Sequence, residues 1–221
     1  MPKGVLWRHE DIFFAAMGGG DPMQFGNVIT TPDELADRVL EPGLAALPVP
    51  PLMHASAQWL AFHTLYGGGK LVLLPGGRFD PATTWRLVAD ESVNILVIVG
   101  DAMARPLLDV VEQDPDSIDT SSLMALGSGG AILSPSSKER LHARFPDLVV
   151  VDAFGASETD QLGGSPPEDD PFGAPQLSVD ERTAVFDDDL QPVPPGSGGV
   201  GRLARGGRVP LRYHGDAAKS A

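Results

Sequence analysis

The residues best suited to chemistry form one short cluster, Phe154-Gly155-Ala156-Ser157-Glu158-Thr159, directly after a β-branched run. Phe154 offers a flat aromatic face for a base, and Gly155 allows a tight backbone turn. The Ser157 hydroxyl can donate to a phosphate oxygen, and Glu158 is an oxygen ligand of the kind that Mg²⁺ takes together with substrate phosphates. The cluster therefore predicts half of a nucleotide site. The structural alternative is a loop at a strand end in which the Ser-Glu pair caps a helix.

A second segment, Pro2-Lys3-Gly4, has the residue types expected at the end of a phosphate-binding loop. One lysine near a chain end is more often a solvated charge, so this segment alone would carry little weight. Its order in the chain gives it meaning, because a strand-rich stretch separates it from the cluster at Phe154. Together the two segments predict a protein that uses ATP.

Alternating strands and helices must position these segments. Short apolar runs predict buried strands at residues 70–74, 93–99, 123–126 and 148–151. Helices are expected over residues 32–40, 81–92, 101–111 and 135–145, with Asp80 and Ser134 as N-caps of the second and the last. The alternation predicts an α/β fold with a mostly parallel sheet flanked by helices, and ligands at the carboxyl ends of its strands. Both glycine-rich turns, Gly127 to Gly130 and Phe154-Gly155, are expected at that edge.

The C-terminal part of the chain differs in composition and in predicted structure. Residues 183–186 and 199–203 predict a small antiparallel β region near the C-terminus, and residues 165–171 predict an acidic, proline-rich loop. We expect residues 1–163 to be the central α/β part of one domain and residues 164–221 to be a loop- and β-rich portion of the same domain.

Composition excludes several classes of protein. The chain has 221 residues, no cysteine and a formal net charge of −14. The lack of cysteine excludes disulfides, zinc-thiolate sites and thiol nucleophiles in this sequence. The negative charge disfavours binding to nucleic acid, which needs cationic surface. No apolar run is long enough to span a bilayer, so we expect no integral membrane segment and a cytoplasmic protein.

Several motifs together resemble the adenylate-forming (AMP-dependent) acyl-CoA synthetase family. Phe154 to Glu158 resembles the family's aromatic-Gly-x-Ser/Thr-Glu signature, and Pro2-Lys3-Gly4-Val5 resembles the end of its phosphate loop. Gly100 to Pro106 resembles a bacterial branch that acts on long-chain fatty acids or steroid side chains. Further matches follow in the family's order at 51–54, 194–198 and 210–213. The resemblance thus covers nearly the whole chain.

The resemblance implies an activity and a role for each site residue. The parent enzyme would activate a carboxylic acid with ATP and Mg²⁺ to an acyl-adenylate, and would then transfer the acyl group to coenzyme A. Phe154 would stack on adenine, and Asp152 would meet the adenine amino group. Ser157 and Lys3 would contact phosphate, and Glu158 would hold Mg²⁺. The adenine and acyl side of the pocket would be lined by Gly127, Ser128, Gly129 and Gly130, with Gly155 in the signature turn. His54 would lie near the acyl carboxylate.

The resemblance also implies that the chain is an incomplete N-terminal domain. The glycine-rich front of the phosphate loop would precede Met1, and the family's C-terminal subdomain is not in the sequence. Gly215-Asp216 resembles the family's ribose-binding pair, but its context matches an earlier segment of the family. We therefore expect this chain alone to release little pyrophosphate with a fatty acid, ATP and Mg²⁺.

Two other functions stay open at this point. One is a nucleotide-binding remnant without catalysis, which would bind ATP but not turn it over. The other is an α/β-hydrolase with Ser157 as nucleophile. That fold needs Gly-x-Ser-x-Gly, and Thr159 stands where the second glycine would be.

Overall fold

A large mixed sheet organises the molecule. The computed structural model describes residues 4–17, 29–38, 43–115, 117–164, 178–179 and 181–220. Within these residues the sheet has seven strands. In spatial order they are β3 (Lys70–Leu71), β2 (Ala45–Pro48), β4 (Ile95–Ile98), β5 (Ala125–Gly129), β6 (Val149–Ala156), β7 (Asp160–Gly164) and β8 (Ser178–Val179).

The sheet is parallel from β3 to β6 and antiparallel from β6 to β8. Each parallel connection contains an α-helix, because parallel neighbours need a long crossover. These helices are α2 (Ala55–Tyr66), α3 (Pro81–Asp90), α4 (Gly100–Gln113) and α5 (Pro135–Arg144). A three-residue turn suffices between β6 and β7, since they are antiparallel. The mostly parallel α/β fold predicted from the sequence is confirmed.

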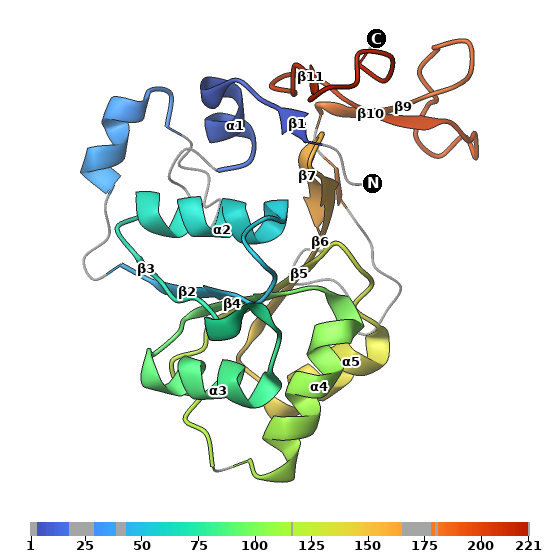
Figure 1. Ribbon diagram of the computed structural model, residues 1–221. Coiled ribbons are helices and arrows are strands. Elements are labelled where there is room, and N and C mark those ends of the chain that lie inside the picture. The colour runs from blue at the N-terminus through green and yellow to red at the C-terminus, as the bar shows by residue number, and fades with distance from the viewer. Residues whose placement is uncertain are drawn as a thin grey trace.

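The helices form layers on both faces of the sheet. Figure 1 shows α3, α4 and α5 side by side on one face, with α2 on the other and α1 (His9–Ala15) beyond it. The main core lies under α3 to α5, where the Trp85 indole is buried and donates to the Leu107 carbonyl at 2.8 Å. Leu96 and Leu126 point into this core from neighbouring strands. This close-packed core thereby supports the carboxyl ends of the parallel strands.

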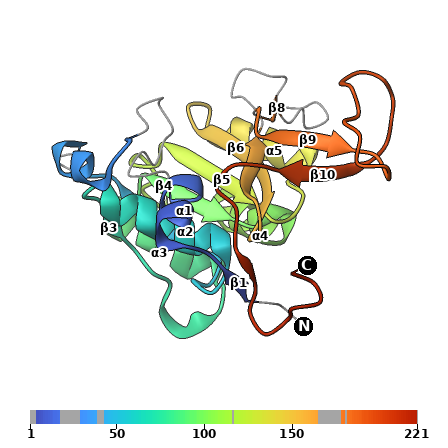
Figure 2. The same cartoon turned by 90° about the horizontal axis from the view of Figure 1, so that it is seen from above.

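Two small antiparallel pairs lie beyond β7. One pairs β9 (Thr183–Phe186) with β10 (Arg202–Arg205), and the other pairs β1 (Val5–Leu6) with β11 (Arg212–Tyr213). Figures 1 and 2 both show β9 and β10 extending away from the large sheet, and Figure 2 shows β1 running beside the C-terminal segment. The antiparallel region predicted near the C-terminus is confirmed, although its second strand spans Arg202–Arg205 and so only overlaps the predicted residues 199–203.

Capping of two helices is confirmed. The Asp80 carboxylate accepts from the Thr83 N–H at 2.9 Å, and the Ser134 hydroxyl accepts from the Ser137 N–H at 3.3 Å. Each cap satisfies an N–H at the first turn of its helix, and a proline follows each at the first helical position.

Other boundaries were wrong. The strand predicted over residues 70–74 ends at Leu71, and the helix predicted to reach residue 92 ends at Asp90. The segment 32–38 is a 3-10 helix, η2 (Pro32–Arg38). A short 3-10 turn, η3 (Pro75–Gly77), follows β3. Residues 39–40 and the loop predicted over residues 165–171 lie outside the described residues, and the division at residue 163 stays a prediction.

Candidate functional site

The turn between β6 and β7 carries the Phe154–Thr159 cluster. The turn predicted at Phe154-Gly155 was wrong, because strand β6 continues through both residues to Ala156 and the chain turns at residues 157–159. The register of β6 against β7 shifts between Phe154 and Gly155. A Cβ on Gly155 would lie 2.2 Å from the Asp160 carbonyl oxygen, so glycine is required there. Two reciprocal bonds of 3.1 Å, Thr159 N to Ala156 O and Ala156 N to Thr159 Oγ1, close the turn. The turn leads into a strand, so the helix-capping alternative is wrong.

Contacts across the chain join this turn to the N-terminal segment. The Trp7 indole N–H donates to the Ser157 carbonyl oxygen at 3.0 Å, across 150 positions of sequence. In the β1–β11 pair, Val5 lies opposite Tyr213, whose hydroxyl donates to Glu158 Oε1 at 2.8 Å. Lys3 lies outside the described residues, two positions before Val5. The described residues that directly follow Lys3, from Val5 to Trp7, therefore lie beside the turn that carries Glu158.

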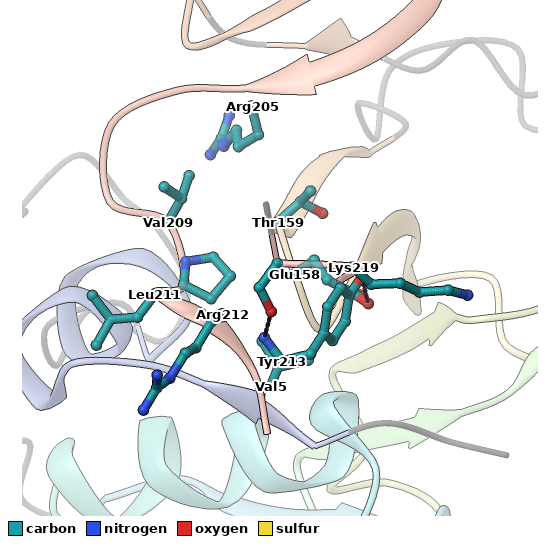
Figure 3. Close-up of a pocket in the computed structure, with 11 residues that line it drawn as sticks. Val5, Glu158, Thr159, Arg205, Val209, Leu211, Arg212, Tyr213 and Lys219 are labelled. Carbon is teal, nitrogen blue, oxygen red and sulfur yellow. Dashed lines mark hydrogen bonds between the residues drawn. The ribbon is translucent and has the colours of Figure 1, made fainter. Parts of the chain in front are cut away.

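A cavity of about 290 Å³ lies at this junction. Figure 3 shows the Glu158 side chain directed at Tyr213, while Arg212 and Lys219 extend away in opposite directions. The lining combines one carboxylate with hydroxyl, cationic and apolar side chains; its residues are Val5, Glu158, Thr159, Arg205, Val209, Pro210, Leu211, Arg212, Tyr213, Lys219 and Ser220. A carboxylate beside hydroxyl groups, with Arg212 and Lys219 at the wall, suits an anionic ligand that carries its own metal ion.

A buried ion pair fixes one wall of the cavity. Arg205 Nη2 lies 3.2 Å from Asp160 Oδ1, and the two side chains are 3% and 2% exposed. Arg205 Nη1 also donates to the Thr183 hydroxyl at 2.9 Å. The pair ties β10 to the residue that follows the Glu158 turn. No local sequence pattern predicts this pair, because the partners are 45 positions apart.

Asp152 lies on β6, beside Ser128 of β5 in the parallel register. Its carboxylate is buried and pairs with the Lys138 ammonium of α5 at 2.9 Å. The Ser128 hydroxyl accepts from the Gly100 N–H at 3.1 Å, at the start of α4. Sequence reasoning missed Lys138, since a lysine on an amphipathic helix is usually solvated.

The glycine-rich segment at 127–130 was predicted as a turn, and this was wrong. Gly127 to Gly129 lie within β5 and pair with both neighbouring strands. The chain turns at Gly130, whose φ of +83° favours glycine. A Cβ on Gly129 would lie 3.2 Å from the Ala153 carbonyl oxygen, so β5 lies close to β6 just before Phe154. Residues 127–130 therefore lie beside β6, the strand that carries Phe154 and Gly155.

His54 lies at the same edge of the sheet but farther from the cavity. It is exposed, follows β2 and precedes α2, and its N–H donates to the Pro51 carbonyl at 2.9 Å. In the sheet order, β4 and β5 separate β2 from β6. The structure thus places His54 on the carboxyl edge without bringing it to Glu158.

The chemistry of the site fits a metal ion held mainly by a ligand. Among the described residues no group of three His, Asp or Glu side chains could enclose a metal ion. Mg²⁺ needs no such group, because it is bound through one or two carboxylates plus phosphate oxygens and water. The Glu158 carboxylate fits this role, since Tyr213 donates to its Oε1 and, among the residues that the structure describes, no hydrogen bond reaches Oε2.

A hydrolase site is not supported. In the part of the chain that the structure describes, no hydrogen bond joins the Ser157 hydroxyl to a histidine, as a Ser-His pair would require.

Within the described residues, the structure has no helix with the length and apolar character needed to cross a membrane.

The chain is similar to known proteins over most of its length. A family model described as AMP-binding enzyme matches residues 1–208. The chain is 42% identical to a 3-oxocholest-4-en-26-oate–CoA ligase from Rhodococcus rhodochrous over 99% of its own length. It is 40% identical to a medium/long-chain-fatty-acid–CoA and 3-oxocholest-4-en-26-oate–CoA ligase from Mycobacterium marinum over 100% of its length. In both cases the chain spans 40% of the relative.

Solved structures support the fold. VinN superposes with a TM-score of 0.72 at 19% identity, covering 100% of this chain and 50% of VinN. PA1221, a nonribosomal peptide synthetase (NRPS) protein containing adenylation and PCP domains, gives a TM-score of 0.65 at 24% identity, covering 80% of this chain and 36% of that protein. At these identities the likeness concerns the fold alone.

Proposed function

The chain belongs to the AMP-binding enzyme family, and from this premise we propose that it carries the nucleotide site of an acyl-CoA ligase. The relatives named above, which are ligases of fatty acids or of a steroid side chain, support the substrate class. Because the chain spans 40% of those relatives, the complete reaction is proposed for the longer protein to which this region corresponds. ATP and coenzyme A would be its co-substrates, and we propose the cytoplasm, where both are available, as its location.

One observation carries the proposal. Val5 of the N-terminal segment lines one cavity together with Glu158 and Thr159 of the turn, and the Trp7–Ser157 bond joins the two segments across 150 positions of sequence. If the two segments met only to pack against each other, no polar cavity would be needed between them. A nucleotide site does, since it must collect phosphate oxygens beside a carboxylate.

The proposed reaction has two steps. A substrate carboxylate oxygen attacks the α-phosphorus of ATP, a new O–P bond forms, and pyrophosphate leaves with the electrons of the broken bond. The coenzyme A sulfur then attacks the acyl carbonyl as the thiol proton passes to water, a C–S bond forms, and AMP leaves with the electrons of the broken acyl C–O bond. Negative charges converge in the first step, and a bound Mg²⁺ would supply charge neutralisation there. Neither step needs a nucleophile from the protein, in keeping with the lack of cysteine.

Each site residue receives a role in this proposal. Phe154 stacks on adenine from the end of β6, and Asp152, held by Lys138, accepts from the adenine amino group. Ser157 and Lys3 donate to phosphate oxygens, while Glu158 presents its carboxylate to the metal ion.

The remaining residues shape the pocket. Gly127, Gly129 and Gly130 are proposed to line the adenine and acyl side of the site, and Gly155 allows the close approach of β6 to Asp160. Ser128 acts through its bond to the Gly100 N–H, since its side chain is buried. His54 lies at the rim of the carboxyl edge, on the side proposed for the acyl group.

Calorimetric titration with ATP tests the proposal. We expect ATP to bind in the presence of Mg²⁺ and to bind more weakly in excess EDTA. Glu158→Gln should weaken Mg²⁺-dependent binding about tenfold or more, because it removes the charge of the metal ligand. Glu139→Gln is the matched control, since Glu139 is exposed on α5. Binding without Mg²⁺ dependence in the unmodified chain, or equal effects of the two variants, would reject the site.

A further inference from the structure

Tyr213 makes the closest polar contact with the carboxylate at the centre of the proposed site. Its hydroxyl donates to Glu158 Oε1 at 2.8 Å, across 55 positions of sequence. Figure 3 shows this contact at the wall of the cavity. Tyr213 was part of a sequence motif but received no role there.

The backbone of Tyr213 is fixed on both sides. Strand β11 pairs with β1, and flanking bonds run from Leu211 N to Leu6 O at 2.8 Å and from His214 N to Gly4 O at 2.7 Å. The Tyr213 N–H donates to the Ser220 hydroxyl at 3.0 Å. The phenol therefore projects from an anchored position beside Gly4, the residue that follows Lys3.

The kind of donor matters. Arg205, Arg212 and Lys219 line the same cavity, and any of them would partly neutralise a carboxylate that it paired with. The donor bonded to Glu158 is instead a neutral phenol, so the negative charge stays available to a cation. The phenol donates to Oε1, and among the described residues no group donates to Oε2.

We propose that Tyr213 is a positioning residue that orients the Glu158 carboxylate for its metal ion. The proposal rests on the proposed function. It assigns Tyr213 a place behind the metal ligand, where a hydrogen bond fixes the direction in which the carboxylate binds.

The test is the cation dependence of nucleotide binding in the 221-residue chain. Tyr213→Phe removes the hydroxyl alone, and Tyr66→Phe is the matched control, since Tyr66 lies in an aromatic cluster on α2. The apparent dissociation constants of Mg²⁺ and Mn²⁺ are measured by calorimetry at fixed ATP. We expect Tyr213→Phe to raise both about tenfold, as for other partners of metal ligands, and Tyr66→Phe to leave them unchanged.

A second variant separates positioning from support of the fold. In the Glu158→Gln background the Tyr213→Phe change should have no further effect on the dissociation constants of Mg²⁺ and Mn²⁺, because Tyr213 acts on the metal ion only through Glu158. A merely structural tyrosine would instead lower ATP affinity in EDTA and in Mg²⁺ alike, and that result overturns the proposal. Unchanged cation constants in Tyr213→Phe overturn it as well, while Mg²⁺-dependent binding by the unmodified chain leaves the proposed function standing. No Mg²⁺-dependent binding by the unmodified chain would overturn both.

Discussion

Replacing Gly155 by alanine tests whether the turn that carries Glu158 depends on close backbone contact. The added Cβ would lie 2.2 Å from the Asp160 carbonyl oxygen, about 1 Å short of the 3.4 Å at which ordinary contact begins. The obstructing atom belongs to the backbone, so no side-chain rotation relieves the overlap. Strand β6 and the start of β7 must move apart, and Asp160 is itself held by the buried pair with Arg205.

The expected loss of stability is large, because no side-chain rotation relieves the overlap. Overpacking in a well-packed site costs about 1–3 kcal/mol, and the upper end applies where backbone must shift. For a chain of this size, about 3 kcal/mol corresponds to a decrease in melting temperature of roughly 6–12 °C. We also expect weaker Mg²⁺-dependent ATP binding, because Glu158 lies in the same turn.

Thermal unfolding followed by circular dichroism measures the effect. Gly206→Ala is the matched control, since its Cβ would approach nothing closer than the Arg182 carbonyl oxygen at 3.7 Å. If Gly155→Ala melts within about 2 °C of the Gly206 variant, the close-contact reasoning is wrong.

Other sites give further predictions. Lys138→Met should lower the free energy of unfolding by about 3 kcal/mol, because it leaves the buried Asp152 carboxylate unpaired. Lys70→Met, which breaks an exposed ion pair, should cost less than about 1 kcal/mol; equal losses in urea unfolding would contradict the difference in burial. Partial burial disfavours the Asp101 charge, but hydrogen bonds from Ser134 and its neighbours outweigh this and lower the Asp101 pKa to about 2. This stabilisation is present at neutral pH and is lost as the pH falls from 3.8 to about 2, so urea unfolding of Asp101→Asn should depend less steeply on pH in that range.

Local sequence signals predicted much of the fold. Asp80 and Ser134 each precede a proline, and both cap helices as expected. The error at Gly127 has a clear physical cause. Glycine has low strand propensity, but Gly127 pairs with Val97 on one side and Val151 on the other, and this pairing overrides local preference.

The candidate site was less accessible to sequence reasoning. The Phe154–Thr159 cluster was recognisable, because its residue types suit a nucleotide. Its partners were not, since Trp7 contacts Ser157 and Tyr213 contacts Glu158 only through the folded arrangement of β1 and β11. No periodicity links residues that far apart in the chain.

If this site belongs to an acyl-CoA ligase, it should bind an acyl-adenylate. The most direct measurement is a calorimetric comparison of AMP with a non-hydrolysable long-chain acyl-adenylate analogue, in which a sulfamate replaces the phosphate. We expect the analogue to bind at least about tenfold more tightly than AMP, since burial of two methylene groups already accounts for that factor. Phe154→Ala should weaken both ligands, because they share the adenine. An analogue that binds no more tightly than AMP, or that binds equally well to Phe154→Ala, would contradict binding of an acyl-adenylate at this site.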